Sequence, residues 1–165
     1  MNNPNIINQF PSLRSKSYSR VNLDFENGYL REVTAEAIFE LIRDIQDPEH
    51  PYTLEDLGVV SLSDIKIYTV YNNTNIKCTD GFPLKFIEVQ FTPTVPHCSL
   101  VGIIGLSIAY QLYKHTRNYV IKLRITKGSH HQEEIYNKQL NDRERVFAAF
   151  ENESILEIIE NSINK

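Results

Sequence analysis

The chain has two cysteines, Cys78 and Cys98, and the surroundings of Cys98 favour chemistry. Cys98 follows His97 and lies just before an apolar segment with helical spacing. Unpaired backbone N–H groups at a helix start and a neighbouring imidazolium both stabilise a thiolate, so this position favours a reactive thiol. Free cysteine is also among the residue types most often buried, and Cys98 could be a small apolar residue between a strand and a helix. The local pattern leaves both interpretations open.

Zinc is a second candidate for this region. His97, Cys98, His130, His131 and Glu133 supply sulfur, imidazole and carboxylate groups, which zinc accepts. Their spacing matches no short zinc motif. The adjacent His130 and His131 point to different sides of a helix, so at most one of them would serve a given site. A zinc site built from these residues therefore stays an alternative hypothesis.

Other cysteine chemistry places further demands on the sequence. A cysteine-dependent hydrolase needs a base and a group that orients it, with His97 or His130 and an acidic residue as candidates. Two cysteines are too few for one chain to hold a four-cysteine iron-sulfur cluster, although a cluster shared with a partner is conceivable. Gly102 and Gly105 lie in an apolar helix pattern and not in a phosphate-binding loop.

Length and composition limit the classes of protein to consider. The 165 residues are enough for one domain, and 41% hydrophobic with 23% charged residues is ordinary for a soluble globular chain. A net charge of -4 without a basic stripe predicts no direct nucleic-acid partner. The low cysteine count favours a reducing compartment, and without a long apolar stretch we expect no membrane span.

The N-terminal part divides into a tail and the start of a fold. Residues 1–30 are rich in polar residues without periodicity, which predicts a flexible tail before a single folded domain over 31–165. Apolar residues recur at helical spacing over 34–45, and the Asp47-Pro48 step ends that helix. Alternating residues over 65–71 predict a strand.

The middle of the chain predicts a hairpin and a βαβ crossover. A second strand, 86–91, follows turn residues and should pair antiparallel with the first strand through a long tip that contains Cys78. A helix over 100–116 and a strand over 119–126 then complete a crossover with parallel strands. The predicted class is α+β, with helices packed on the sheet and Cys98 in a loop at the strand ends, where ligands gather in such folds.

The last third predicts helices. Ser129 with Gln132 fits a capping box for a helix that starts near His130, and breaks are expected at 141–142 and 151–152. Gly102 and Gly105 should allow a neighbouring backbone to approach the crossover helix. One face of the terminal helix is expected to carry four isoleucines: Ile155, Ile158, Ile159 and Ile163.

Four segments together resemble the cytosolic iron-sulfur assembly component 2 family, also called MIP18-like. They are DPEHPYTLEDLGVV at 47–60, FTPTVPHCS at 91–99, IGLSI at 104–108 and EEIYNKQLNDRERV at 133–146. The resemblance implies that 31–165 is an iron-sulfur assembly domain. It also implies a non-catalytic adaptor that joins a WD40 propeller protein and a HEAT-repeat scaffold and serves cytosolic and nuclear client apoproteins.

The resemblance also assigns residues. It implies that Cys98 is the reactive, functionally required cysteine and that Thr92, Pro93, Pro96 and His97 shape its loop. Since GSH at 128–130 resembles the family's Gly-Thr-His step, His130 is the expected neighbour of Cys98.

Some properties stay open under this resemblance. No permanent cofactor is expected, while a transient iron-sulfur cluster or zinc and a homodimer are alternatives, in the cytoplasm and also in the nucleus. The segment 72–85 looks longer than usual for the family, and the N-terminal tail has no counterpart in it.

Overall fold

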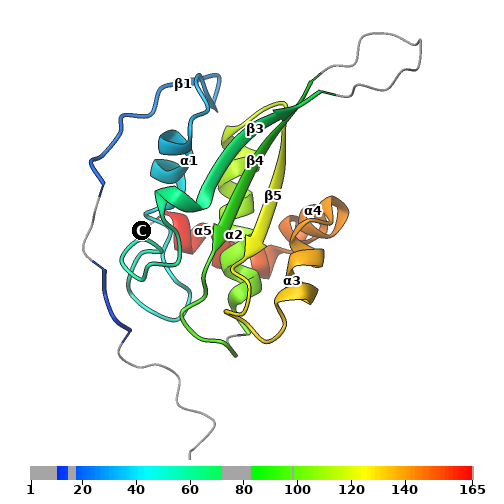
Figure 1. The fold of residues 1–165 in the computed structure, drawn as a ribbon. Helices are drawn as coiled ribbons and strands as arrows, with labels where there is room; N and C mark the ends of the chain where they lie inside the picture. The colour runs from blue at the N-terminus through cyan, green and yellow to red at the C-terminus, as the bar shows by residue number, and fades with distance from the viewer. Residues whose placement is uncertain (1–10, 15–17, 72–82, 98, 165) are drawn as a thin grey trace, which may run out of the picture.

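The main sheet has three strands in the order β3-β4-β5, and the hairpin and crossover predicted from the sequence are both present. The computed structural model describes residues 11–14, 18–71, 83–97 and 99–164. The strands are β3 (Ile65–Val70), β4 (Leu84–Phe91) and β5 (Tyr119–Ile125). β3 pairs antiparallel with β4, and β5 pairs parallel with β4 after helix α2 (Val101–His115). The α+β class is confirmed (Figure 1).

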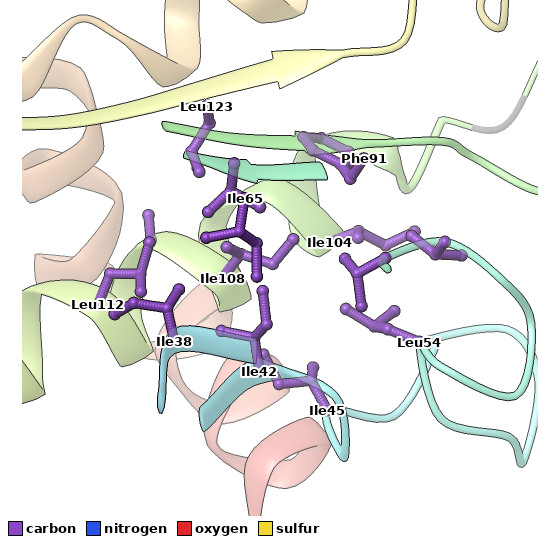
Figure 2. Close-up of a cluster of buried hydrophobic side chains, with 14 of the residues drawn as sticks. Ile38, Ile42, Ile45, Leu54, Ile65, Phe91, Ile104, Ile108, Leu112 and Leu123 are labelled. Atoms are coloured by element: carbon purple, nitrogen blue, oxygen red, sulfur yellow. The ribbon is translucent and has the colours of Figure 1, made fainter. Parts of the chain in front are cut away.

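Helices α1 (Ala35–Ile42) and α2 enclose the main core with one face of the sheet. Thr34 caps α1, because its hydroxyl accepts the Ala37 amide at 3.1 Å, and the helix ends before the predicted residue 45. A short 3₁₀ helix, η1 (Leu62–Asp64), leads into β3. Figure 2 shows side chains from α1, α2 and the sheet meeting in one apolar cluster, which includes Ile38, Ile42, Ile104, Ile108, Phe91 and Leu123.

Three helices follow the sheet: α3 (Glu133–Leu140), α4 (Arg143–Glu151) and α5 (Glu153–Ile163). The predicted breaks are confirmed, because Asp142 and Asn152 accept first-turn amides and start new helices. The predicted apolar face of α5 is only partly buried. Ile159 is fully buried, whereas Ile158 is 45% exposed. Adjacent helical positions diverge by about 100°, so the contact of α5 with the core takes one of the two.

Helix α3 begins later than predicted, and the capping box is absent. The Ser129 hydroxyl donates to the Thr126 carbonyl at 2.6 Å and therefore does not cap the helix. Gly128 next to it has φ +80°, a left-handed conformation that glycine adopts without strain. Ser129, which the sequence pattern assigned to a helix start, instead belongs to the turn after β5.

Gly102 and Gly105 of α2 leave space that side chains occupy, and not a neighbouring backbone. A Cβ on Gly105 would lie 2.5 Å from Leu140 Cδ1, and a Cβ on Gly102 would lie 3.1 Å from Tyr136 Cε1. Both neighbours belong to α3. The predicted close approach of a neighbouring backbone is therefore wrong, because α3 packs through its side chains into the notch that the glycines leave.

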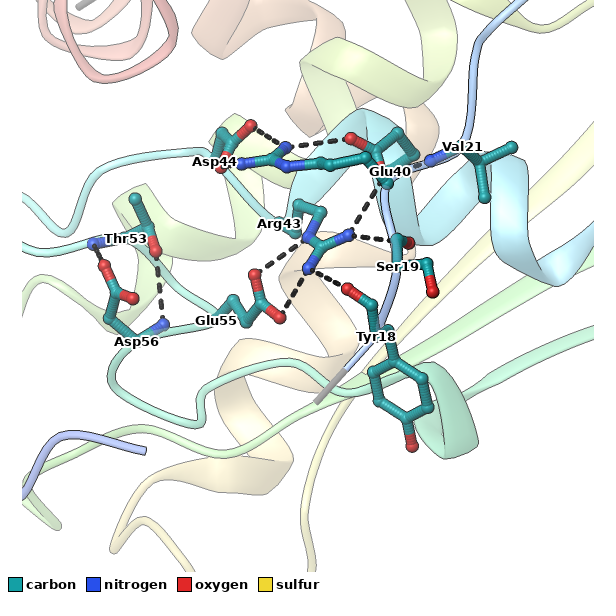
Figure 3. Close-up of polar contacts among 10 residues, drawn as sticks. Tyr18, Ser19, Val21, Glu40, Arg43, Asp44, Thr53, Glu55 and Asp56 are labelled. Atoms are coloured by element: carbon teal, nitrogen blue, oxygen red, sulfur yellow. Dashed lines mark hydrogen bonds and ion pairs between the residues drawn. The ribbon is translucent and has the colours of Figure 1, made fainter. Parts of the chain in front are cut away.

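The segment before α1 differs from the flexible tail predicted over 1–30. Tyr18, Arg20 and Val21 contact Phe39 and Glu40 of α1. A small hairpin of β1 (Phe25–Glu26) and β2 (Tyr29–Leu30) follows. The guanidinium of Arg43 donates to the Tyr18 and Ser19 carbonyls, which ties the segment down (Figure 3). A buried guanidinium has five N–H donors to satisfy, and this backbone supplies acceptors. Residues 1–10 and 15–17 lie outside the described residues, and the domain division at residue 31 stays a prediction.

Candidate functional site

Both cysteines, Cys78 and Cys98, lie outside the described residues, so the site is defined here by the loop around Cys98. Its flanking residues His97 and Ser99 are exposed. The loop leaves the C-terminal end of β4 and enters α2, at the same edge of the sheet as the end of β5 (Figure 1). This is the position predicted from the crossover.

The base of the loop is fixed by Thr92. Its backbone N–H donates to the Val59 carbonyl at 2.8 Å, and its hydroxyl lies 2.6 Å from the Thr126 hydroxyl. Gln90 also donates to the Thr126 hydroxyl, at 3.2 Å. Pro93 is buried directly after this anchor. Thr92 and Pro93 were predicted from the sequence. Thr126 was not, and the parallel register of β4 and β5 places it beside Thr92.

The far end of the loop is fixed by His131, immediately before α3. The His131 backbone N–H donates to the Pro96 carbonyl at 3.1 Å. The rings of His97 and His131 stack with centroids 4.0 Å apart and an interplanar angle of 18°. The sequence suggested His131 as a metal ligand and did not indicate this contact. Two adjacent histidines gave no signal for which of them would meet the loop.

His130, the predicted neighbour of Cys98, is buried. Its ring lies edge-on to Tyr136, with centroids 5.4 Å apart, and its Nδ1 accepts the Gln132 backbone N–H at 3.1 Å. Nδ1 therefore carries no proton, so a neutral imidazole here carries its proton on Nε2. A contact between His130 and Cys98 stays a prediction.

Glu133 is engaged with the turn before α3. Its carboxylate accepts the Gly128 backbone N–H at 2.6 Å. Within 11–14, 18–71, 83–97 and 99–164, no three histidine, cysteine or acidic side chains gather as metal ligands would. The described candidates His97, His130 and Glu133 therefore do not fit a zinc site among themselves, and ligation that involves Cys98 stays a prediction.

The start of α2 lies three residues after Cys98. Leu100 occupies the N-cap position, and leucine has no side-chain oxygen to accept the first-turn amides. The positive end of the helix dipole therefore faces the loop without a side-chain carboxylate or hydroxyl at the cap. This arrangement suits an anionic group near the loop.

The chain matches known proteins over most of its length. The chain is 46% identical over 123 residues to a MIP18 family protein of Caenorhabditis elegans, covering 74% of this chain and 70% of that protein. The chain belongs to the MIP18 family. It is also 43% identical to mouse cytosolic iron-sulfur assembly component 2B over 128 residues, which is 77% of this chain and 71% of the mouse protein.

A third relative matches a larger share of the chain. Cytosolic iron-sulfur assembly component 2B of Dictyostelium discoideum is 39% identical over 151 residues, 90% of this chain and 85% of that protein. No family model matches the chain. These relatives confirm the family that the four sequence segments indicated. Among the described residues, no helix is long and apolar enough to cross a membrane.

Proposed function

We propose that this protein is a non-enzymatic adaptor of cytosolic iron-sulfur protein assembly and that its Cys98 loop contacts the cluster or the client protein during transfer. The observation that carries the proposal is the 39–43% identity, over most of the chain, to two proteins named cytosolic iron-sulfur assembly component 2B. That name supports a role in the assembly machinery. The adaptor role and the role of Cys98 are the finer steps of this proposal.

The geometry of the loop supports a role in holding Cys98 for contact with a partner. Thr92 anchors its start to two other segments, and Pro96 and His97 are held by His131. Cys98 comes directly after these anchored residues in the sequence. A group carried by a restrained loop loses less conformational entropy when it binds a partner, so the restraint favours a contact site.

The cargo of the proposed step is an iron-sulfur cluster. Cysteine thiolates are the usual ligands of such clusters, which take about four of them, so Cys98 would share the cluster with ligands from a carrier or client. The start of α2 follows Cys98 closely in the sequence, and the positive end of a helix dipole supports a thiolate over a thiol. A transient zinc ion would use the same thiolate.

The proposed partners are a WD40 propeller protein and a HEAT-repeat scaffold, with iron-sulfur apoproteins as clients. The proposed compartment is the cytosol, with nuclear clients also served. A homodimer stays a prediction, because the structure contains one chain.

An affinity experiment from native cytosol tests the adaptor role. Tagged wild-type protein, Cys98→Ala and Cys78→Ala are compared, and circular dichroism checks that each is folded. Wild type and Cys78→Ala should recover both scaffold proteins and the clients, whereas Cys98→Ala should recover the scaffolds with fewer clients. Absence of both scaffolds from the wild-type sample would contradict the adaptor role, and equal client recovery by Cys98→Ala would remove Cys98 from it.

A second experiment separates the adaptor from a cysteine hydrolase. The isolated protein is incubated with simple ester substrates, and product release and acylation at Cys98 are measured. An adaptor should give no turnover. Repeated product release that is lost in Cys98→Ala would instead establish an enzyme.

A further inference from the structure

One face of the sheet is not covered by a helix in the part of the chain that the structure describes. α2 lies behind the sheet in Figure 1. The buried residues of each strand pack with α2 in the core, so the residues that alternate with them lie on the opposite face. Sheets with one uncovered face normally show mostly small polar residues there. We call this surface the open face, and its residues are Lys66, Tyr68, Val70, Leu84, Phe86, Glu88, Gln90, Val120, Lys122 and Arg124.

The centre of the open face is an aromatic and cationic row across all three strands. The rings of Tyr68 and Phe86 stack with centroids 5.1 Å apart and an interplanar angle of 12°. From the other side, Lys122 Nζ lies 4.7 Å from the Phe86 centroid. Val70, Leu84 and Val120 around this row are 40–45% exposed. The row is therefore an apolar surface that contains a cation. A sheet face that only contacts solvent would normally carry fewer apolar side chains.

Positive charge dominates this surface, although the whole chain has a net charge of -4. Lys66, Lys122 and Arg124 lie on the open face with one carboxylate, Glu88, which accepts the Tyr68 hydroxyl at 3.3 Å. Among the described residues, none of the three cations forms an ion pair. A local excess of unpaired cations on an acidic protein attracts an acidic partner.

A groove continues the positive surface along the outer edge of β5. It has a volume of about 520 Å³ and lies between β5 and α3. Lys122, Arg124 and Lys127 line it, together with Glu133, whose carboxylate is engaged by the Gly128 amide. The groove therefore adds Lys127 to the two open-face cations that also line it, Lys122 and Arg124.

The edge of β5 is blocked at one end and open at the other. The Asn141 side chain both accepts the Leu123 amide at 3.1 Å and donates to the Leu123 carbonyl at 2.7 Å, and Asn137 accepts the Ile125 amide at 2.7 Å. These amides imitate a neighbouring strand. At Ile121, two residues earlier on the same edge, no described side chain takes this role, so an extended segment could pair there.

We propose that the open face and the β5 groove bind an acidic segment of a partner protein. Its carboxylates meet Lys122, Arg124 and Lys127, and an apolar side chain packs on Val120 and Phe86. Single-stranded nucleic acid fits less well, because base stacking needs a free aromatic face and both faces of Phe86 are covered, by Tyr68 and by Lys122. The proposal goes beyond the adaptor function and does not depend on Cys98.

Fluorescence anisotropy with the full chain tests the proposal. The probe is a fluorescein-labelled peptide of the length of β5 in which Glu alternates with Leu, and the comparison peptide has Gln in place of Glu. We expect the acidic peptide to bind wild type about tenfold more tightly than the Gln peptide. Its affinity should fall as salt is added. The double variant Lys122→Glu with Arg124→Glu should lose this binding, while Lys114→Glu, a charge reversal on α2, should retain it.

The outcomes separate cleanly. If the double reversal does not fold, as judged by circular dichroism, Lys122→Gln with Arg124→Gln replaces it and should weaken binding by about tenfold. Equal binding of the acidic peptide to wild type and to either folded double variant overturns the proposal. So does tighter binding of an oligothymidine probe of similar length. Because the probe contains no cluster ligand, failure here would leave the Cys98 experiments unaffected.

Discussion

Arg43 and Glu55 form a bidentate ion pair inside the protein. Arg43 Nε lies 2.8 Å from Glu55 Oε2, and Arg43 Nη2 lies 2.7 Å from Glu55 Oε1. The side chains are 1% and 7% exposed. The pair joins α1 to the segment that precedes β3, and the remaining guanidinium donors hold the chain at Tyr18 and Ser19. One side chain therefore connects three segments that are distant in sequence (Figure 3).

Removing Arg43 should be strongly destabilising. In Arg43→Met the Glu55 carboxylate stays buried without its cation, and we expect the free energy of unfolding to fall by about 3–5 kcal/mol. The measurement is urea denaturation. The double variant Arg43→Met with Glu55→Leu should recover part of the loss, and a cost for the double variant equal to the sum of the single costs would show that the two side chains do not interact.

The stability of the protein should fall in acid partly through Glu40. Burial alone raises the pKa of Glu40, but hydrogen bonds from Arg20, the Val21 amide and Arg43 outweigh it, so this pKa lies below its usual value of 4.5. A carboxyl group whose folded pKa is depressed stabilises the protein above the unfolded pKa and loses this contribution as pH falls through the folded pKa. Urea unfolding should show stability falling below about pH 4.5, less steeply in Glu40→Gln. Identical slopes would exclude Glu40 as a contributor.

The two glycines of α2 should respond differently to alanine. Gly105→Ala places a Cβ 2.5 Å from Leu140, and the overpacking should cost about 1–3 kcal/mol despite the better helix propensity. Gly102→Ala is the matched control, because its Cβ would lie 3.1 Å from the Tyr136 ring edge, and a gain of up to about 1 kcal/mol in helix propensity offsets that contact. Thermal unfolding measures both, and equal midpoints would refute the close contact at Gly105.

The Asn141 side chain should stabilise the free edge of β5. Asn141→Ala removes two hydrogen bonds to Leu123, and we expect a loss of about 1–3 kcal/mol together with faster exchange of the Leu123 amide. Asn161→Ala, at an exposed position of α5, is the control and should change stability by less than about 0.5 kcal/mol. Unchanged exchange at Leu123 in Asn141→Ala would contradict the assigned role.

The stack of His97 on His131 should restrain the loop. In His131→Ala we expect faster hydrogen exchange of the residue 131 amide, which donates to the Pro96 carbonyl, with a change in global stability of about 1 kcal/mol or less. His131→Phe keeps a flat ring and should restore most of the protection. Equal exchange in wild type and His131→Ala would show that the backbone hydrogen bond to Pro96 is sufficient to hold the loop.

The sequence by itself determined the local elements and the position of the loop. Alternation in β3 and β4, helical spacing in α1 and α2, and caps at Asp142 and Asn152 depend on neighbours a few residues away, so a local pattern can specify them. The parallel crossover followed because the order strand, helix, strand allows one common arrangement. The family was also evident from ordered segments of the chain.

The tertiary structure decided what depends on distant partners. It held Tyr18 and Ser19 beside α1, because the buried guanidinium of Arg43 requires acceptors that no local pattern reveals. It brought His131 and not His130 onto His97, since the turn at Gly128 sets which of two adjacent rings faces the loop. Among the described residues it also left the open face without a covering helix, because the number and placement of helices around a sheet follow from packing of the whole chain and not from the strands themselves.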